Sequence, residues 1–168
     1  IKKIAMCGIS GFIGKIDIKK KDINKTLFLM KNRGPDANGH IKFHDKKSDL
    51  RVNLLHTRLN IIDLDKRSNQ PFTIENLTII FNGEIYNYIE LRKELISKGV
   101  KFLTKSDTEV LLQSYKVFGL SFFKKIEGMW SFAIWDNKKK ELILSKDRFS
   151  EKPLYVYKNN DGIYFGSE

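Results

Sequence analysis

Short apolar runs rich in β-branched residues, separated by turn-forming residues, limit how this chain can fold. The runs fall mainly into two groups, and segments with helical spacing lie before and between the groups. Runs of this kind, bounded by Gly, Asn and Asp, are typical of short strands joined by turns. The sequence therefore predicts an α+β domain in which helices cover antiparallel sheets.

Several local signals sharpen this prediction. A strand is expected over residues 5–13, where small residues allow a close approach of backbone or ligand. Another apolar strand, from Asn76 to Phe81, is expected to break at Asn82-Gly83. Helices are expected from a cap at Asp22 to about Asn32, from Tyr88 to Lys98 before Gly99, and from a cap at Ser106 or Asp107 to Val117.

Length and composition exclude several classes of protein. The 168 residues suit one domain, and 41% hydrophobic with 12% aromatic residues is too rich for a disordered chain. The single cysteine, Cys7, excludes an intrachain disulfide scaffold and a structural zinc module. No apolar run is as long as a membrane span or a signal peptide. We therefore expect a cytoplasmic protein with no membrane partner.

The net charge of +11 raises the question of a polyanionic partner. The basic residues are mostly lysines in short turn-like clusters, such as Lys19–Lys21 and Lys138–Lys140, which is typical of solvated loops. No nucleic-acid-binding signature accompanies them. We therefore predict no nucleic-acid partner, and keep a basic nucleic-acid binder as a lower-ranked alternative.

Cys7 is a candidate nucleophile. It follows Met6 and lies in the small-residue run Cys7-Gly8-Ile9-Ser10-Gly11. If Met6 is the initiator and is removed, the α-amine of Cys7, with a pKa near ~8, can take the thiol proton without a histidine. A papain-like pair would need one of His40, His44 and His56, and the sequence singles out none of them. His40 and His44 without further ligands make a poor metal site, so no metal is expected.

Three other segments carry groups suited to a small polar substrate. Asn82-Gly83-Glu84 is either a plain hairpin turn or an oxyanion hole made of an amide and a glycine N–H. Arg58 is either a surface ion-pair partner or a bidentate clamp for a carboxylate. Asp107 is either part of a helix cap or a partner for an ammonium group. Together, Arg58 and Asp107 would hold the two charged ends of a free α-amino acid.

The motifs taken together resemble a known family. The motifs that carry the resemblance occur in the same order as in the family. They are Met6-Cys7-Gly8-Ile9-Ser10-Gly11, the segment from Asn32 to Asp36, the segment from His56 to Asp63, Gln70-Pro71-Phe72, the segment from Phe81 to Asn87, Ser106–Glu109, Gly128–Asp136 and Lys152–Tyr155. The chain resembles the N-terminal glutaminase domain of glutamine-hydrolysing asparagine synthetase, a class II glutamine amidotransferase. Several motifs matching at once make chance agreement very improbable.

The resemblance implies a fold and a set of site residues. The fold is that of N-terminal-nucleophile hydrolases, a four-layer αββα sandwich of two antiparallel sheets. Cys7 would attack the carboxamide of L-glutamine, and Asn82 with Gly83 would stabilise the oxyanion. Arg58 would bind the α-carboxylate and Asp107 the α-amine, with Glu84 nearby. The pocket would be lined by Leu59, Asn60, Ile61 and Ile62.

The resemblance also implies a larger enzyme. Residues 7–168 would be the amidotransferase domain, and residues 1–6 a leader, a propeptide or residues added at the start. The domain itself would need no cofactor, whereas ATP and Mg²⁺ would serve a synthetase domain that this chain lacks. That domain would use the ammonia to make asparagine from aspartate, and a homodimer is possible. The alternatives are the glutaminase half of another amidotransferase, such as a sugar-modifying one, or an inactive homologue that keeps its leader.

Ser150 departs from the family pattern, which usually has glycine at this position. A glycine there would suggest a turn with positive φ, so either mild backbone strain at Ser150 or an altered loop is expected, without loss of chemistry.

Overall fold

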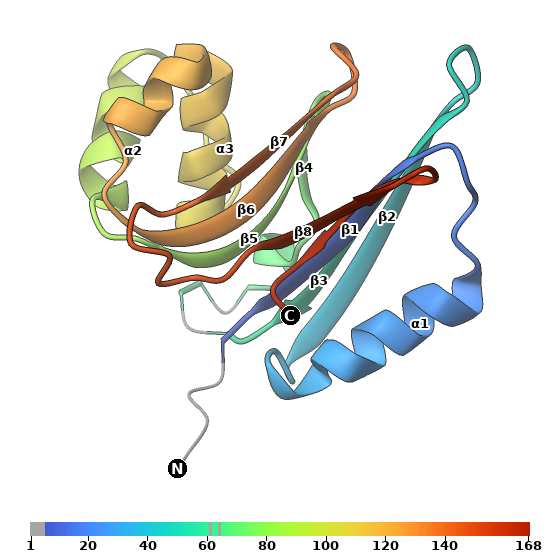
Figure 1. Cartoon of the computed structure of the whole chain (residues 1–168). Coiled ribbons are helices and arrows are strands. Elements are labelled where there is room, and N and C mark those ends of the chain that lie inside the picture. Colours follow the sequence, from blue (N-terminus) through green and yellow to red (C-terminus); the bar gives the residue numbers. More distant parts are fainter. Residues whose placement is uncertain (1–5, 61, 64) are drawn as a thin grey trace.

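The computed structural model describes residues 6–60, 62–63 and 65–168, and its strands form two antiparallel sheets (Figure 1). The first sheet has the order β2-β3-β1-β9-β8 and the second the order β4-β5-β6-β7. The strands of the first sheet are β1 (Gly8–Gly14), β2 (Ala37–Asp45), β3 (Leu50–Arg58), β8 (Tyr155–Asn159) and β9 (Gly162–Gly166). Those of the second are β4 (Phe72–Ile74), β5 (Leu77–Ile85), β6 (Gly128–Asp136) and β7 (Glu141–Lys146).

Helices cover the two outer faces of the pair of sheets. Figure 1 shows α1 (Lys20–Leu29) along the first sheet and both α2 (Tyr88–Ser97) and α3 (Asp107–Phe118) against the second. The short 3-10 helices are η1 (Met30–Asn32), η2 (Lys66–Ser68) and η3 (Gly119–Lys124). The prediction of a four-layer α+β sandwich of two antiparallel sheets is therefore confirmed. None of the helices in the described part of the chain is long and apolar enough to cross a membrane.

Strand alternation builds the core, because successive side chains of a strand point to opposite faces of its sheet. In β5, Ile79 and Phe81 pack toward α2 and α3, whereas Ile80 packs against the first sheet. The layer between the sheets also holds Leu54 of β3 and Trp135 of β6, both fully buried. Burying side chains of this size contributes about 1.5–3 kcal/mol each.

Toward one end, the layer between the sheets becomes polar. His56 of β3 is fully buried, and its Nε2 lies 3.1 Å from the Phe81 carbonyl oxygen of β5. Burial lowers the pKa of His56 to about 3, so the ring is neutral and its Nε2–H donates to that carbonyl. Asn82 and Ser131 face each other across β5 and β6 in the same layer. This polar end adjoins the candidate site.

The local predictions are mostly confirmed, with two corrections. The helix after residue 19 begins at Lys20 and is N-capped by Lys19, so Asp22 lies in its first turn and is not its cap. The strand predicted to break at Asn82-Gly83 continues to Ile85, because β6 pairs with it through Gly128. At α3, Ser106 is the cap: its Oγ accepts a hydrogen bond from the Glu109 N–H at 3.2 Å.

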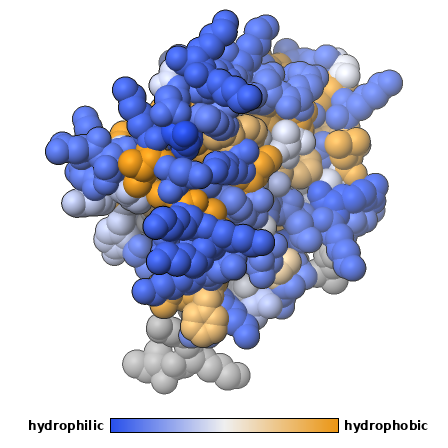
Figure 2. All heavy atoms as spheres, turned by 90° about the vertical axis from the view of Figure 1, so that its right-hand side faces the viewer, coloured by the Kyte–Doolittle hydropathy of each residue, from blue (hydrophilic) through white to orange (hydrophobic). Residues whose placement is uncertain are grey.

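Part of the molecular surface is shown in Figure 2. The visible face is largely hydrophilic, with small hydrophobic areas between the polar side chains. This agrees with the interpretation of the lysine clusters as solvated turns: Lys46, Lys47, Lys138 and Lys139, for example, are exposed beside hairpin ends.

Candidate active site

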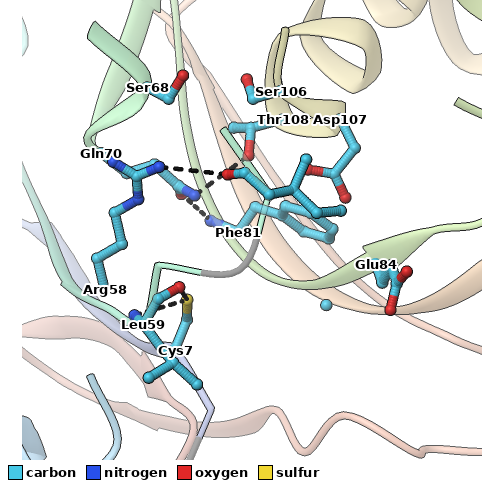
Figure 3. A pocket seen from close by; sticks show the side chains of 12 residues that line it. Cys7, Arg58, Leu59, Ser68, Gln70, Phe81, Glu84, Ser106, Asp107 and Thr108 are labelled. Atoms are coloured by element: carbon cyan, nitrogen blue, oxygen red, sulfur yellow. Dashed lines mark hydrogen bonds between the residues drawn. The ribbon is translucent and has the colours of Figure 1, made fainter. Parts of the chain in front are cut away.

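A narrow pocket lies where the start of β1, the end of β3, the end of β5 and the N-terminus of α3 meet (Figure 3). The centre of a water molecule can move through about 60 Å³ of it. Seven of the ten residues predicted for the site line this pocket, namely Cys7, Arg58, Leu59, Ile62, Gly83, Glu84 and Asp107. The topology therefore brings together groups that are up to 100 positions apart in the sequence (Asp107 minus Cys7).

The nucleophile candidate lies at the floor of the pocket beside the segment that follows β3. The Cys7 thiol donates to the Leu59 carbonyl oxygen, with Sγ 3.7 Å from it, and accepts from the Leu59 N–H at 3.4 Å. The Nε–H of Arg33 donates to the Cys7 carbonyl oxygen at 3.1 Å and so fixes the backbone there. Burial raises the pKa of the Cys7 thiol, although the Leu59 hydrogen bond and the Arg58 charge oppose this effect. The thiol therefore needs a base to become a nucleophile at neutral pH.

The edge of β5 that faces the pocket presents the N–H groups of Phe81, Gly83 and Ile85, because alternate N–H groups of a strand point to the same edge. The Phe81 N–H donates to Gln70 Oε1 at 2.6 Å, and the Ile85 N–H donates to Asp107 Oδ2 at 3.1 Å. Between them, the Gly83 N–H has no side-chain acceptor among the described residues. A donor held in this way, in the wall of a pocket that contains a thiol, is suited to bind a developing oxyanion.

Glycine is required at position 83 by the neighbouring strand. A Cβ at this position would lie 2.2 Å from the Met129 carbonyl oxygen of β6. Any larger residue would push β5 away from β6 and move the Gly83 N–H.

Asn82 lies between the sheets and does not line the pocket. Its side chain is 1% exposed, and its Nδ2 has no hydrogen-bond acceptor in the described part of the chain. An unmatched buried amide donor costs about 1–3 kcal/mol, so its presence beside the pocket needs an explanation. Asn82 adjoins Gly83 in β5, so its amide meets a molecule bound in the pocket only on turning toward it from between the sheets.

Arg58 is buried at 5% exposure, and among the described residues its guanidinium donates to neutral oxygens of the loop after β3. Its Nη1 donates to Asn69 Oδ1 at 2.6 Å and to the Asp65 carbonyl oxygen at 3.2 Å, while Nη2 donates to the carbonyls of Ile62 and Asp63. No carboxylate of the described residues forms an ion pair with it. A buried cation of this kind favours an anionic ligand.

Asp107, at the start of α3, is the opposite charge in the pocket. Burial, together with the nearby Glu84 carboxylate, raises its pKa to about 6, although hydrogen bonds from the backbone N–H groups of Ile85 and Thr108 oppose this effect. In Figure 3, Asp107 and Glu84 lie on the side of the pocket away from Cys7. Two acidic groups there are suited to an ammonium group.

The residues predicted to line the pocket from the segment after β3 differ in where they lie. Leu59 and Ile62 line the pocket, whereas Asn60 is exposed and its N–H donates to Asp36 Oδ2 at 2.7 Å. Ile61 lies outside the described residues.

The sequence reasoning did not assign roles to Gln70 and Thr108, which form part of the pocket wall. Gln70 Oε1 holds the Phe81 N–H, and its Nε2 donates to Thr108 Oγ1 at 3.2 Å, so it ties β5 to α3. Both residues lie in motifs that carry the family resemblance, Gln70-Pro71-Phe72 and Ser106–Glu109.

The other candidate groups lie elsewhere. His40 contacts Asn53 and His44 contacts Asp49, both on the outer face of the first sheet. Within the described ranges, no three His, Cys, Asp or Glu side chains gather as they would around a metal ion.

Comparison with known proteins agrees with this geometry. A family model described as "Glutamine amidotransferase domain" matches residues 6–168. "Asparagine synthetase [glutamine-hydrolyzing] 1" of Bacillus subtilis is 42% identical over 170 residues, which cover 97% of this chain and 26% of that protein. "Putative asparagine synthetase [glutamine-hydrolyzing] 2" of Methanocaldococcus jannaschii is 36% identical over 181 residues, covering 97% of this chain and 34% of that protein. The chain therefore spans about a quarter to a third of the length of these relatives.

A solved structure supports the fold. Glutamine phosphoribosylpyrophosphate amidotransferase from B. subtilis, complexed with ADP and GMP, superposes with a TM-score of 0.76. The superposition covers 96% of this chain and 42% of that one, at 22% sequence identity. Likeness at this identity concerns the arrangement of the two sheets and their helices.

Proposed function

Because the chain belongs to the family of glutamine amidotransferase domains, we propose that it hydrolyses L-glutamine to glutamate and ammonia with Cys7 as the nucleophile. One observation carries the proposal: the Cys7 thiol shares a narrow pocket with the Gly83 N–H, which has no side-chain acceptor among the described residues, the buried Arg58 cation and the buried Asp107 carboxyl group. This set has a group for each part of the substrate.

The two charged groups orient the substrate. Arg58 binds the α-carboxylate, since its buried guanidinium is hydrogen-bonded to neutral oxygens and forms no ion pair with a described carboxylate. Asp107 binds the α-ammonium group, with Glu84 adding negative charge on the same side. The side chain of glutamine then extends toward Cys7 and places its carboxamide carbon against Sγ.

The chemical step follows from these positions. The Cys7 α-amine takes the thiol proton, and Sγ forms a bond to the amide carbon while the carbonyl π electrons move to oxygen. The Gly83 N–H and the Asn82 amide, which turns toward the pocket from between the sheets, stabilise the resulting oxyanion. The ammonium of Cys7 gives its proton to the leaving nitrogen, the C–N bond breaks, and ammonia leaves a γ-glutamyl thioester. Water then cleaves the C–S bond, releases glutamate and restores the thiol.

The scheme requires a free amine on Cys7, because an acylated nitrogen is a peptide amide and is not basic. We therefore propose that the active form begins at Cys7. Removal of residues 1–6 converts the backbone nitrogen of Cys7 into a free α-amine, and the scheme needs no other base.

The larger enzyme is also part of the proposal. We infer that a synthetase domain of the same polypeptide uses the ammonia, with ATP and Mg²⁺, to convert aspartate to asparagine in the cytoplasm. The names of the two relatives support this product, and homodimer formation is kept as a possible assembly.

The test compares two forms of the protein whose first residues are established by intact mass, one that begins at Cys7 and one that keeps residues 1–6. Glutamate release from glutamine is measured for both forms and for Cys7→Ala in the shorter form. We expect release by the Cys7-start form alone. Release by Cys7→Ala, or equal release by the form that keeps residues 1–6, would refute the assignment.

A further inference from the structure

A second cavity lies on the other face of the first sheet, away from Cys7. Helix α1 and the following η1 cover this face only in part: Ile23 of α1 and Met30 of η1 pack on Leu55 of β3. Beside the start of α1, a cavity remains open between the helix and the strands, and the centre of a water molecule can move through about 470 Å³ of it. This volume is of the size that small-molecule sites occupy. Figure 2 views the molecule from the side on which α1 begins in Figure 1.

The strand register places one row of side chains across this face. Tyr157 of β8 pairs with Tyr164 of β9, which pairs with Phe12 of β1, which pairs with Asn53 of β3. The ring centroids are 4.7 Å apart between Phe12 and Tyr164 and 6.2 Å apart between Tyr164 and Tyr157. Phe12, Tyr164 and Asn53 all line the cavity. The cavity thus has an aromatic wall beside an amide, and such a wall is suited to a planar ring.

Only one end of the Asn53 carboxamide has a hydrogen-bond partner among the described residues. The side chain is 1% exposed, and its Oδ1 lies 2.9 Å from His40 Nε2. Its Nδ2 has no acceptor among the described residues. Exchanging the amide oxygen and nitrogen would only move the unmatched end, because His40 offers a single ring nitrogen there. A buried amide in the wall of an open cavity therefore points to a ligand with a hydrogen-bonding edge.

The mouth of the cavity is basic. Lys19, the N-cap of α1, makes no side-chain capping bond, and Lys19 and Lys21 are exposed at the helix N-terminus. Two aspartates also line the cavity, but Asp17 is paired with Lys42, and Asp22 lies within the first turn of α1. Neither Lys19 nor Lys21 forms an ion pair with a described carboxylate. A helix N-terminus with two lysines favours a phosphate or another anion.

We propose that this cavity binds a nucleoside monophosphate. The base lies against Tyr164, with Phe12 behind it, and an acceptor on its edge takes the free Asn53 N–H. The phosphate lies at the start of α1 near Lys19 and Lys21. An inorganic anion alone would leave the aromatic wall and the amide unused, and an apolar ligand would leave the amide and the lysines unmatched. The site shares β1 and β3 with the pocket of Cys7 but lies on their opposite face.

The first test is calorimetric titration of the whole chain with AMP and with UMP, and with two smaller compounds that each lack one part of a nucleotide. Ribose 5-phosphate lacks the base, and adenosine lacks the phosphate. We expect at least one nucleotide to bind with a dissociation constant below about 1 mM, and each smaller compound to bind about tenfold or more weakly, since stacking and phosphate contacts both contribute. No binding of either nucleotide up to several millimolar, or equal binding of ribose 5-phosphate, would overturn the proposal.

The second test uses variants. Asn53→Leu removes the amide at similar volume, and Lys19→Ala/Lys21→Ala changes only exposed positions, so at least one variant is expected to fold normally by circular dichroism. Each folded variant should weaken nucleotide binding about tenfold. The matched control is Lys46→Ala/Lys47→Ala in the β2–β3 turn, which removes the same charge and should leave binding unchanged. Equal weakening by the control would show a general charge effect and reject the site.

Discussion

Two charged groups of the candidate active site, Arg58 and Asp107, are buried without a partner of opposite charge in the described part of the chain. Burial of an unmatched charge destabilises a fold, and ordinary core packing gives no reason to keep one. A free α-amino acid carries one charge of each sign and would match both groups. The pair therefore accounts for the specificity that we propose, and it also predicts a conflict between stability and activity.

Asp107→Asn tests this conflict. Burial raises the pKa of Asp107 to about 6, above its value in the unfolded chain, so the folded protein binds the proton more tightly. Its stability is therefore expected to fall as the pH rises from about 4 to about 6, and the cost at pH 7 is about 2–3 kcal/mol. Asp107→Asn carries no such charge. It should be more stable than the parent at pH 7 and show no advantage at pH 4.

The same variant should lose substrate affinity. The neutral amide cannot pair with the α-ammonium group, so the KM for glutamine should rise about 10–100-fold. In the parent, KM should also rise as the pH falls below about 6, because Asp107 becomes protonated. Chemical denaturation and steady-state kinetics at both pH values provide the two measurements. A variant that is less stable at pH 7 and binds glutamine normally would contradict this role for Asp107.

At the scale of elements, the end of β5 is the part of the fold that organises the chemistry. Side chains from outside the strand, Gln70 and Asp107, occupy the N–H groups on either side of Gly83. His56 of β3 also holds the Phe81 carbonyl and so links the two sheets at this point. The strand is fixed from three directions, which keeps the Gly83 N–H in place before any substrate binds.

Asn82→Ala tests the amide at this end of β5. Loss of one oxyanion donor typically lowers kcat by about 10²–10³-fold, and KM should change little. The fold should tolerate the change, because the Asn82 Nδ2 has no acceptor to lose among the described residues. Ser131→Ala is the matched control, since Ser131 lies opposite Asn82 and its Oγ is also buried and unmatched. If the control slowed glutamine hydrolysis as much as Asn82→Ala, the amide would have no specific role.

The loop between β7 and β8 contains a strained residue, Ser150, in a turn held by several hydrogen bonds. Ser150 has φ 58°, which confirms the expectation of a positive-φ turn at the position where the family usually has glycine. Asp147 secures this turn by accepting the N–H groups of Trp130, Phe149, Glu151 and Lys152. Ser150→Gly should therefore raise the free energy of unfolding by about 0.5–1 kcal/mol.

Ser150→Ala is the control for that change, because it removes the hydroxyl and keeps the strain. Chemical denaturation should show a gain for glycine and none for alanine. Equal effects of the two substitutions would mean that the backbone at Ser150 carries no strain.

At the scale of the whole molecule, the fold joins the two ends of the described chain. β1 pairs with β9, so the strand that follows Cys7 lies beside the strand near the C-terminus, and the Ile9 N–H donates to Ser167 Oγ at 3.1 Å. The two sheets then stack so that β3 and β5 meet at His56 and Phe81. These long-range pairings convert separate motifs into one pocket.

The sequence predicted much of this architecture. Local periodicity and turn residues indicated the antiparallel strands and a helix cap at Ser106 or Asp107, and the motif resemblance indicated the stacking and most pocket residues. The continuation of β5 through Asn82-Gly83 was missed, since Asn-Gly is a strong turn signal locally and only pairing with β6 overrides it. The role of Gln70 and the exposure of Asn60 were also missed, because both depend on contacts between distant segments.

The central claim is that Cys7 forms a covalent bond to the γ-carbonyl carbon of glutamine. It is tested most directly by mixing the Cys7-start protein with glutamine, quenching with acid within a turnover, and locating any adduct by peptide mass spectrometry. We predict one glutamyl group on the peptide that begins with Cys7, and none in Cys7→Ala. Steady hydrolysis of glutamine with the adduct on another residue, or hydrolysis that persists in Cys7→Ala, would contradict the account.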